Sequence, residues 1–200
     1  MLAPLRATRK SGTERLRDNG ADLGCDLLSF WQWSVSDLVS NATRGVLAEF
    51  IVARALGIPV DTNVRNEWSA FDLKTPDGLT VQVKSAAYVQ SWAQKRLSTI
   101  CFNVKPSRGW DPESGMQKHV LRHAEVYVFA ILAVKEKEKI DPLDVSQWDF
   151  YAIPTRFLNE RKRSQHSITL PSLRAGFEPV RFSELARAVA MAAERARQPG

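Results

Sequence analysis

An apolar stripe with helical spacing begins shortly after residue 40. Its members recur every three or four residues, as they do on the buried side of an amphipathic helix: Val46, Leu47, Phe50, Ile51 and Leu56. Ser40 or Asn41 supplies an N-cap, while Gly57 and then Pro59 end the helix. The pattern therefore predicts a helix that opens at residue 40 or 41 and closes at Gly57.

The next segments change to the period of two that is typical of strands. Leu79, Val81 and Val83 alternate with polar residues after a Thr-Pro-Asp-Gly turn at 75–78, so residues 68–84 are predicted to form a hairpin. Further strands are predicted at 98–105 and 148–153. The run Val126 to Val134 is uniformly apolar, which indicates a strand buried on both faces.

The remaining patterns complete an α/β fold. Residues 113–123 and 156–163 are predicted to be helical, residues 167–170 to form a short strand, and an Ala-rich helix to begin near Ser183. A buried strand among helices implies a sheet with helices on both faces. We expect residues 25–200 to form one domain, with a core at about 37–155 and a C-terminal α+β extension at 156–200.

Residues 1–24 are expected to be a poorly ordered basic arm. They carry Arg6, Arg9, Lys10, Arg15 and Arg17 among small and polar residues. Two interpretations stay open for this arm, because such a segment is either a solvated tail or a contact for phosphates.

Composition limits the class of protein. The 200 residues contain 28 Lys and Arg against 22 Asp and Glu, a net charge of +6, which favours a polyanionic partner. Residues 154–200 hold nine Arg or Lys against four Glu. No apolar run approaches the roughly 20 residues of a membrane helix, and no secretory signal is readable. Cys25 and Cys101 form no CxxC pair, which fits a reducing cytoplasm.

Polar residues with metal-binding chemistry lie on three consecutive predicted elements. Glu49 sits on the apolar stripe of the first helix, and Asp72 lies in the first strand of the hairpin. Gln82 and Lys84 are two residues apart on the return strand, so they share one side of the sheet. Folding about the turn brings Asp72 roughly opposite Lys84. Carboxylate and amide oxygens, with the Val83 backbone carbonyl, suit Mg²⁺, and the lysine would serve a water nucleophile.

This arrangement resembles the PD-(D/E)XK nuclease superfamily, which includes restriction endonucleases. The resemblance implies a restriction-endonuclease-like mixed sheet flanked by helices, and hydrolysis of DNA phosphodiester bonds with Mg²⁺, for which Mn²⁺ can substitute. It assigns Asp72 and Gln82 to the metal, Glu49 to the helix acid and Lys84 to the motif lysine. Two residues depart from the pattern: Phe71 replaces a proline, and Gln82 replaces an acid that would bind the cation more strongly.

Residues flanking the motif are candidates for contacts with DNA. They combine cations with polar and aromatic groups that can bind phosphates or stack on bases: Arg44, Ser85, Gln90, Trp92, Lys95, Arg96 and Arg108. Cutting both strands of a duplex would need two sites, which a homodimer would supply. Trp68 and Trp148 are expected in the core.

Alternative functions remain open from the sequence. Gln82 is also compatible with a catalytically inactive nucleic-acid-binding module of the same fold. A protein-interaction subunit is a third interpretation, and it predicts an apolar surface near Phe30, Trp31 and Trp33. His119 and His123 have a spacing that can bind zinc, but no third ligand is evident nearby.

Overall fold

A mixed four-stranded sheet forms the centre of the protein in the computed structural model, which describes residue 5 and residues 7–111, 115–162 and 165–198. Its strands are β3 (Leu73–Lys74), β4 (Thr80–Ala87), β8 (Val126–Leu132) and β9 (Trp148–Pro154), in that spatial order. The β3–β4 and β8–β9 pairs are antiparallel, and the central β4–β8 pair is parallel. This sheet confirms the predicted α/β class.

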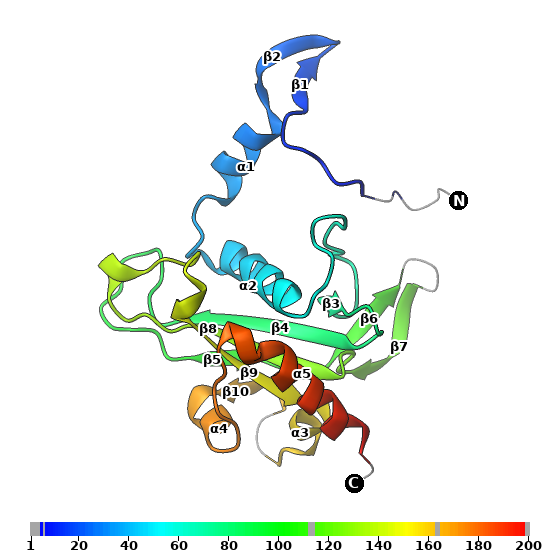
Figure 1. Cartoon of the computed structure of the whole chain (residues 1–200), viewed down its shortest axis with the longest axis vertical. Coiled ribbons are helices and arrows are strands. Elements are labelled where there is room, and N and C mark those ends of the chain that lie inside the picture. The colour runs from blue at the N-terminus through cyan, green and yellow to red at the C-terminus, as the bar shows by residue number, and fades with distance from the viewer. Residues whose placement is uncertain (1–4, 6, 112–114, 163–164, 199–200) are drawn as a thin grey trace.

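Most of the other elements lie around this sheet, while the elements within residues 15–35 project away from it (Figure 1). The helices are α1 (Leu27–Val35), α2 (Asn41–Ala55), α3 (Thr155–Glu160), α4 (Leu170–Arg174) and α5 (Phe182–Arg197), with two 3-10 turns, η1 (Lys137–Lys139) and η2 (Val145–Gln147). The described residues also form three two-stranded antiparallel sheets: β1 (Arg15–Asp18) with β2 (Ala21–Asp26), β5 (Cys101–Asn103) with β10 (Ser167–Thr169), and β6 (Ser107–Asp111) with β7 (Gly115–Leu121).

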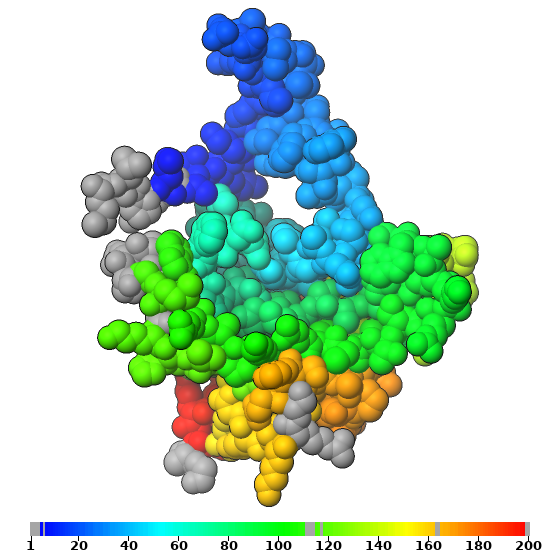
Figure 2. All heavy atoms as spheres, turned by 180° about the vertical axis from the view of Figure 1, so that it is seen from behind, coloured from blue at the N-terminus to red at the C-terminus, as the bar shows by residue number. Residues whose placement is uncertain are grey.

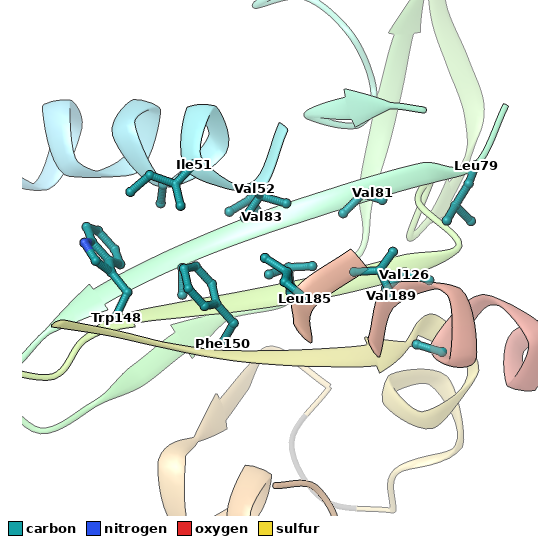
Figure 3. Close-up of a cluster of buried hydrophobic side chains, with 14 of the residues drawn as sticks. Ile51, Val52, Leu79, Val81, Val83, Val126, Trp148, Phe150, Leu185 and Val189 are labelled. Carbon is teal, nitrogen blue, oxygen red and sulfur yellow. The ribbon is translucent and has the colours of Figure 1, made fainter. Parts of the chain in front are cut away.

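Helices α2 and α5 cover one face of the sheet. Ile51 and Val52 of α2 and Leu185 of α5 point into a single buried cluster (Figure 3). The sheet meets them with Val81 and with other alternate residues of β4, β8 and β9. Helix α2 starts where the N-cap predicts, since the Ser40 side chain accepts a hydrogen bond from the backbone N–H of Thr43.

A second apolar cluster covers the opposite face. Phe129 of β8 and Tyr151 of β9 pack there against Phe102 of β5, Leu158 of α3 and Leu173 of α4. Every residue of β8 is buried. The uniformly apolar run was therefore interpreted correctly as a strand covered on both faces, with helices in both layers.

The predicted helix at 113–123 is wrong for its described part, which forms strand β7. Gly115 adopts a positive φ of 75°, and Trp110 of β6 pairs with Met116 across an antiparallel ladder. Pairing with β6 therefore overrides the local helical pattern. Residues 113 and 114 lie outside the described residues.

The N-terminal segment forms regular structure where a poorly ordered arm was expected. Strands β1 and β2 make a hairpin that continues into α1, and the three elements project from the body beside α2 (Figures 1 and 2). Helix α1 buries none of its residues, and Phe30 and Trp33 are exposed. The described helices include none that could cross a bilayer. Both cysteines are free thiols.

Candidate active site at the open edge of strand β4

Among the described residues, strand β4 has no strand partner along most of one edge. Its partner β3 has only two residues, so the antiparallel ladder ends where Leu73 pairs with Val81. The backbone N–H of Val83, the next group beyond the ladder, donates to a side chain, the Asp72 carboxylate, at 2.7 Å. The chain just before β3 thus brings a carboxylate directly against the open edge of the central sheet.

The register of the hairpin differs by two residues from the sequence prediction. The turn is closed by hydrogen bonds from Thr75 N–H to Leu79 carbonyl and from Gly78 N–H to Thr75 carbonyl, both 2.9 Å, which centres it on Asp77. Asp72 therefore lies opposite Gln82 and not opposite Lys84. A shift of two residues keeps every side chain of the hairpin on its predicted face, so Asp72 stays on the side of Gln82 and Lys84.

Asp72 is held by its neighbours on β4. One oxygen, Oδ2, accepts both the Val83 backbone N–H and the Gln82 side-chain amide N–H. Burial raises the pKa of Asp72 above its ordinary value, the Val83 hydrogen bond lowers it, and the negative charge of Glu49 raises it again. Glu49 therefore acts on Asp72 as a like charge.

Lys84 lies two residues beyond Gln82 on the same face of β4, opposite the face of Val83. Among the described residues its ammonium has no hydrogen-bond or ion-pair partner. Its charge acts on Asp72, whose pKa it lowers. The lysine is thus half-buried, close to the carboxylate and free to contact a further group.

Glu49 approaches from α2, the layer that covers the Val83 face, whereas Gln82 and Lys84 lie on the other face of the sheet. Its side chain is only 12% exposed and forms an ion pair with Arg65. Arg65 lies in the segment between α2 and β3, and sequence reasoning missed it because no motif marks it. The site is therefore assembled around the β4 edge from both sides, with Asp72 in the middle.

Tyr127 is a second residue that the sequence did not indicate. It pairs with Gln82 across the parallel β4–β8 ladder and is 5% exposed. Burial raises the pKa of its hydroxyl, and the Asp72 charge raises it further. The only available signal was its place in the apolar run, which predicts burial and says nothing about a neighbouring carboxylate.

Oxygen donors near the β4 edge could hold a hard cation. They comprise the carboxylates of Asp72 and Glu49, the Gln82 amide oxygen and the Val83 carbonyl, which an extended strand sends to the same side as the Val83 N–H. Mutual repulsion of two partly desolvated carboxylates is the condition that a divalent cation relieves. Within the described residues no group of three or more Asp, Glu, His or Cys side chains is placed to hold a metal ion.

Three of the residues predicted to contact DNA bond to one another instead. The Arg44 guanidinium, which is 3% exposed, donates to Ser85 Oγ at 3.2 Å and to Gln90 Oε1 at 3.3 Å. It also donates to Val39 carbonyl at 2.7 Å and to Asn41 Oδ1 at 2.6 Å. Arg44 and Gln90 therefore tie the start of α2 to the end of β4, and their burial argues against direct contact with DNA.

The other four predicted contacts are on the surface. Trp92, Lys95 and Arg96 line a shallow pocket of about 430 Å³ formed by residues 92–99, and Trp92 is exposed. Arg108 is exposed on β6. Figure 2 shows the segment near residue 95 and the β6–β7 hairpin at opposite ends of one face. A nucleic acid that touches both would pass along the intervening length of the sheet.

Trp68 is not in the core as expected, since it is 70% exposed and its ring contacts Trp110 of β6 at 5.6 Å between centroids. Trp148 is fully buried, as predicted. His119 is exposed on β7, and His123 Nε2 lies 2.9 Å from the Ser107 carbonyl, where it has a hydrogen-bond partner other than a metal.

Fold and site together define an α/β protein with an oxygen-donor cluster and a free lysine at a sheet edge. The chain belongs to the bacteriophage T4 endonuclease IV family, whose model matches residues 6–171. This range includes Glu49, Arg65, Asp72, Gln82 and Lys84, and it ends before α5. No curated protein matches the chain. Family membership supports the expectation of a nuclease.

Proposed function

We propose that this protein is a Mg²⁺-dependent nuclease that hydrolyses phosphodiester bonds of DNA. The observation that carries the proposal is the fixed position of the Asp72 carboxylate, between Gln82 and the Val83 backbone and within the field of Glu49 and Lys84. Membership of an endonuclease family and the net charge of +6 support a DNA substrate. Placement of the site in the PD-(D/E)XK superfamily is part of the proposal.

The roles follow from the chemistry of each side chain. Asp72, Gln82 and Glu49, with the Val83 carbonyl, would hold Mg²⁺ or Mn²⁺. When bound, such an ion polarises phosphoryl oxygens and lowers the pKa of water. Lys84 orients the attacking water and stabilises the charge that develops on the phosphoryl oxygens, because its ammonium is not engaged by another described residue. Hydrolysis then breaks the P–O bond to the leaving sugar oxygen.

Cleavage assays test this proposal directly. The wild-type protein should cut plasmid or single-stranded DNA with Mg²⁺ or Mn²⁺ and not with EDTA. Lys84→Ala should lose about 100-fold or more in rate at an unchanged melting temperature. Lys74→Ala, an exposed lysine on the neighbouring strand, is the matched control and should cut at the wild-type rate. Wild-type cleavage by Lys84→Ala would refute the assigned role.

One observation favours a second candidate, a nucleic-acid-binding module without catalysis. Gln82 donates its amide N–H to the Asp72 carboxylate, which an ionised acid at this position could not do. This candidate predicts salt-dependent DNA binding and no cleavage with any divalent cation. A protein-interaction subunit is the third candidate. It would bind its partner through an apolar surface such as the exposed Phe30 and Trp33 of α1. A homodimer stays a prediction.

A further inference from the structure

Arg65 forms a two-pronged contact with the acid that the proposed site contributes from α2. Its Nε lies 2.5 Å from Glu49 Oε2, and its Nη2 donates to Glu49 Oε1 at 3.0 Å. Both carboxylate oxygens of Glu49 therefore bond to one guanidinium. Glu49 is 12% exposed and Arg65 is 37% exposed, so the acid lies within the protein and the arginine covers it from the solvent side.

A cation and Arg65 cannot both use the same oxygens of Glu49. Mg²⁺ requires oxygen ligands at about 2.0–2.1 Å in near-octahedral geometry. A guanidinium that occupies both oxygens in the fork arrangement blocks this approach and adds a positive charge beside the site. The charge of Arg65 also reaches Asp72, whose pKa it lowers. Arg65 thus occupies Glu49 and offsets part of the negative charge of the two acids.

The segment that carries Arg65 is also attached to the body on either side of this residue. Arg54 of α2 pairs with Asp61 at 2.9 Å, and the Trp68 ring contacts Trp110 of β6. These contacts flank Arg65 on both sides and do not involve Glu49. If the Arg65–Glu49 pair opens, the segment remains attached, so the guanidinium is released close to the β4 edge.

We propose that Arg65 holds Glu49 in the cation-free protein and moves to a DNA phosphate when a divalent cation takes Glu49. The inference rests on the proposed metal-dependent nuclease. A released guanidinium presents to a phosphate the same pair of donors that it presents to a carboxylate. Cation binding and DNA binding are then linked, because the first creates the free arginine that the second uses.

Calorimetric titration with Ca²⁺, without DNA, tests the competition. Arg65→Gln should bind Ca²⁺ about tenfold more tightly than the wild type, a change within the usual range of coupling between sites. Arg65→Lys keeps the charge without the fork and should give an intermediate affinity. Arg54→Gln breaks the neighbouring ion pair between the same two segments, and it should bind Ca²⁺ within twofold of the wild type.

A second measurement tests the release. In saturating Ca²⁺, Arg65→Gln should bind a DNA oligonucleotide about tenfold more weakly than the wild type, while Arg54→Gln should lose far less. Unchanged Ca²⁺ affinity in Arg65→Gln, with normal binding by the wild type, would overturn the inference and leave the metal site intact. Tighter Ca²⁺ binding with unchanged DNA affinity would overturn the transfer to phosphate. Failure of the wild type to bind Ca²⁺ would overturn both the inference and the proposed metal site.

Discussion

The Asp72 carboxylate accepts the backbone N–H of Val83 at 2.7 Å, across the point where the β3–β4 ladder ends. This hydrogen bond replaces the strand pairing that β4 lacks beyond Val81. It also fixes the carboxylate in a half-buried position, beside the Glu49 charge. The short hairpin therefore fixes the position of Asp72. The burial and the Glu49 charge at that position raise the pKa of its carboxyl.

The raised pKa of Asp72 predicts a specific dependence of stability on pH. The folded protein holds the proton more tightly than the unfolded chain, whose Asp titrates near 3.8, so this contribution is present below that pH and is lost as pH rises through the raised pKa. In EDTA, the melting temperature of the wild type should fall relative to that of Asp72→Asn as pH rises from about 4 through the raised pKa. Saturating Mn²⁺ should raise the melting temperature of the wild type at pH 7 and leave that of Asp72→Asn unchanged. Parallel pH profiles for the two proteins would contradict the burial argument.

Replacing Gln82 with an acid is predicted to strengthen cation binding. Gln82→Glu adds a negative charge among the proposed ligands, so it should tighten Mn²⁺ binding about tenfold, since charge count sets the affinity of such sites. Without cation, the same variant should be less stable than the wild type, because Asp72 would lose an amide donor and face a like charge. Gln32→Glu, on exposed helix α1, adds the same charge elsewhere and should change neither property. Calorimetry and thermal denaturation measure both effects.

Arg44 predicts a loss of stability where the sequence suggested a DNA contact. Arg44→Ala removes donors from Ser85, Gln90, Val39 and Asn41 at a buried position, and should cost about 2 kcal/mol or more in the free energy of unfolding. Arg54→Ala removes an exposed ion pair on the same helix and should lower the free energy of unfolding by less than about 1 kcal/mol. Urea denaturation compares them. If Arg44→Ala instead leaves stability unchanged and weakens DNA binding, Arg44 contacts a DNA phosphate as the sequence suggested.

The loop at residues 92–99 predicts an electrostatic contribution to DNA binding. Lys95→Ala with Arg96→Ala should lower DNA affinity and reduce the slope of log affinity against log salt by about 1.8 for duplex DNA, if each residue neutralises one phosphate. Lys139→Ala with Arg187→Ala, which removes two exposed cations on η1 and α5, is the comparison. Fluorescence anisotropy across a salt series gives both slopes. Equal slopes for the wild type and the Lys95 and Arg96 variant would exclude this surface.

Sequence patterns predicted the elements whose burial is periodic or uniform. Strand β8 and helix α5 follow their apolar patterns closely, because the core fixes which residues face inward. Helix α2 has the predicted bounds, but its predicted stripe is wrong at Val46 and Phe50, which are exposed, since Ala48 and Val52 face the core beside Ile51. Residues near Gly115 were assigned wrongly, since their state depends on pairing with β6, a contact that local spacing does not record. The hairpin of β1 and β2 at residues 15–26 is not predicted for the same reason.

The sequence predicts which face of β4 carries Gln82 and Lys84, but it does not predict the pairing register of the β3–β4 hairpin. Alternation placed Gln82 and Lys84 on one side of β4, whereas the partner of Asp72 depended on turn geometry that four residues of sequence leave undetermined. Arg65 was unpredictable because its contact with Glu49 spans 16 positions and lies in an irregular segment. Arg44 was misassigned because a cation in a polar sequence context suggests exposure, and only packing shows its burial.

The account depends most on cation binding at the β4 edge, and anomalous scattering from crystals soaked in Mn²⁺ measures it. We predict a peak about 2.1 Å from oxygens of Asp72 and Gln82, with Glu49 released from Arg65 and the peak absent in Asp72→Asn crystals. A wild-type map without a peak between these residues, in crystals of a protein that cuts DNA with Mn²⁺, would contradict the proposed site.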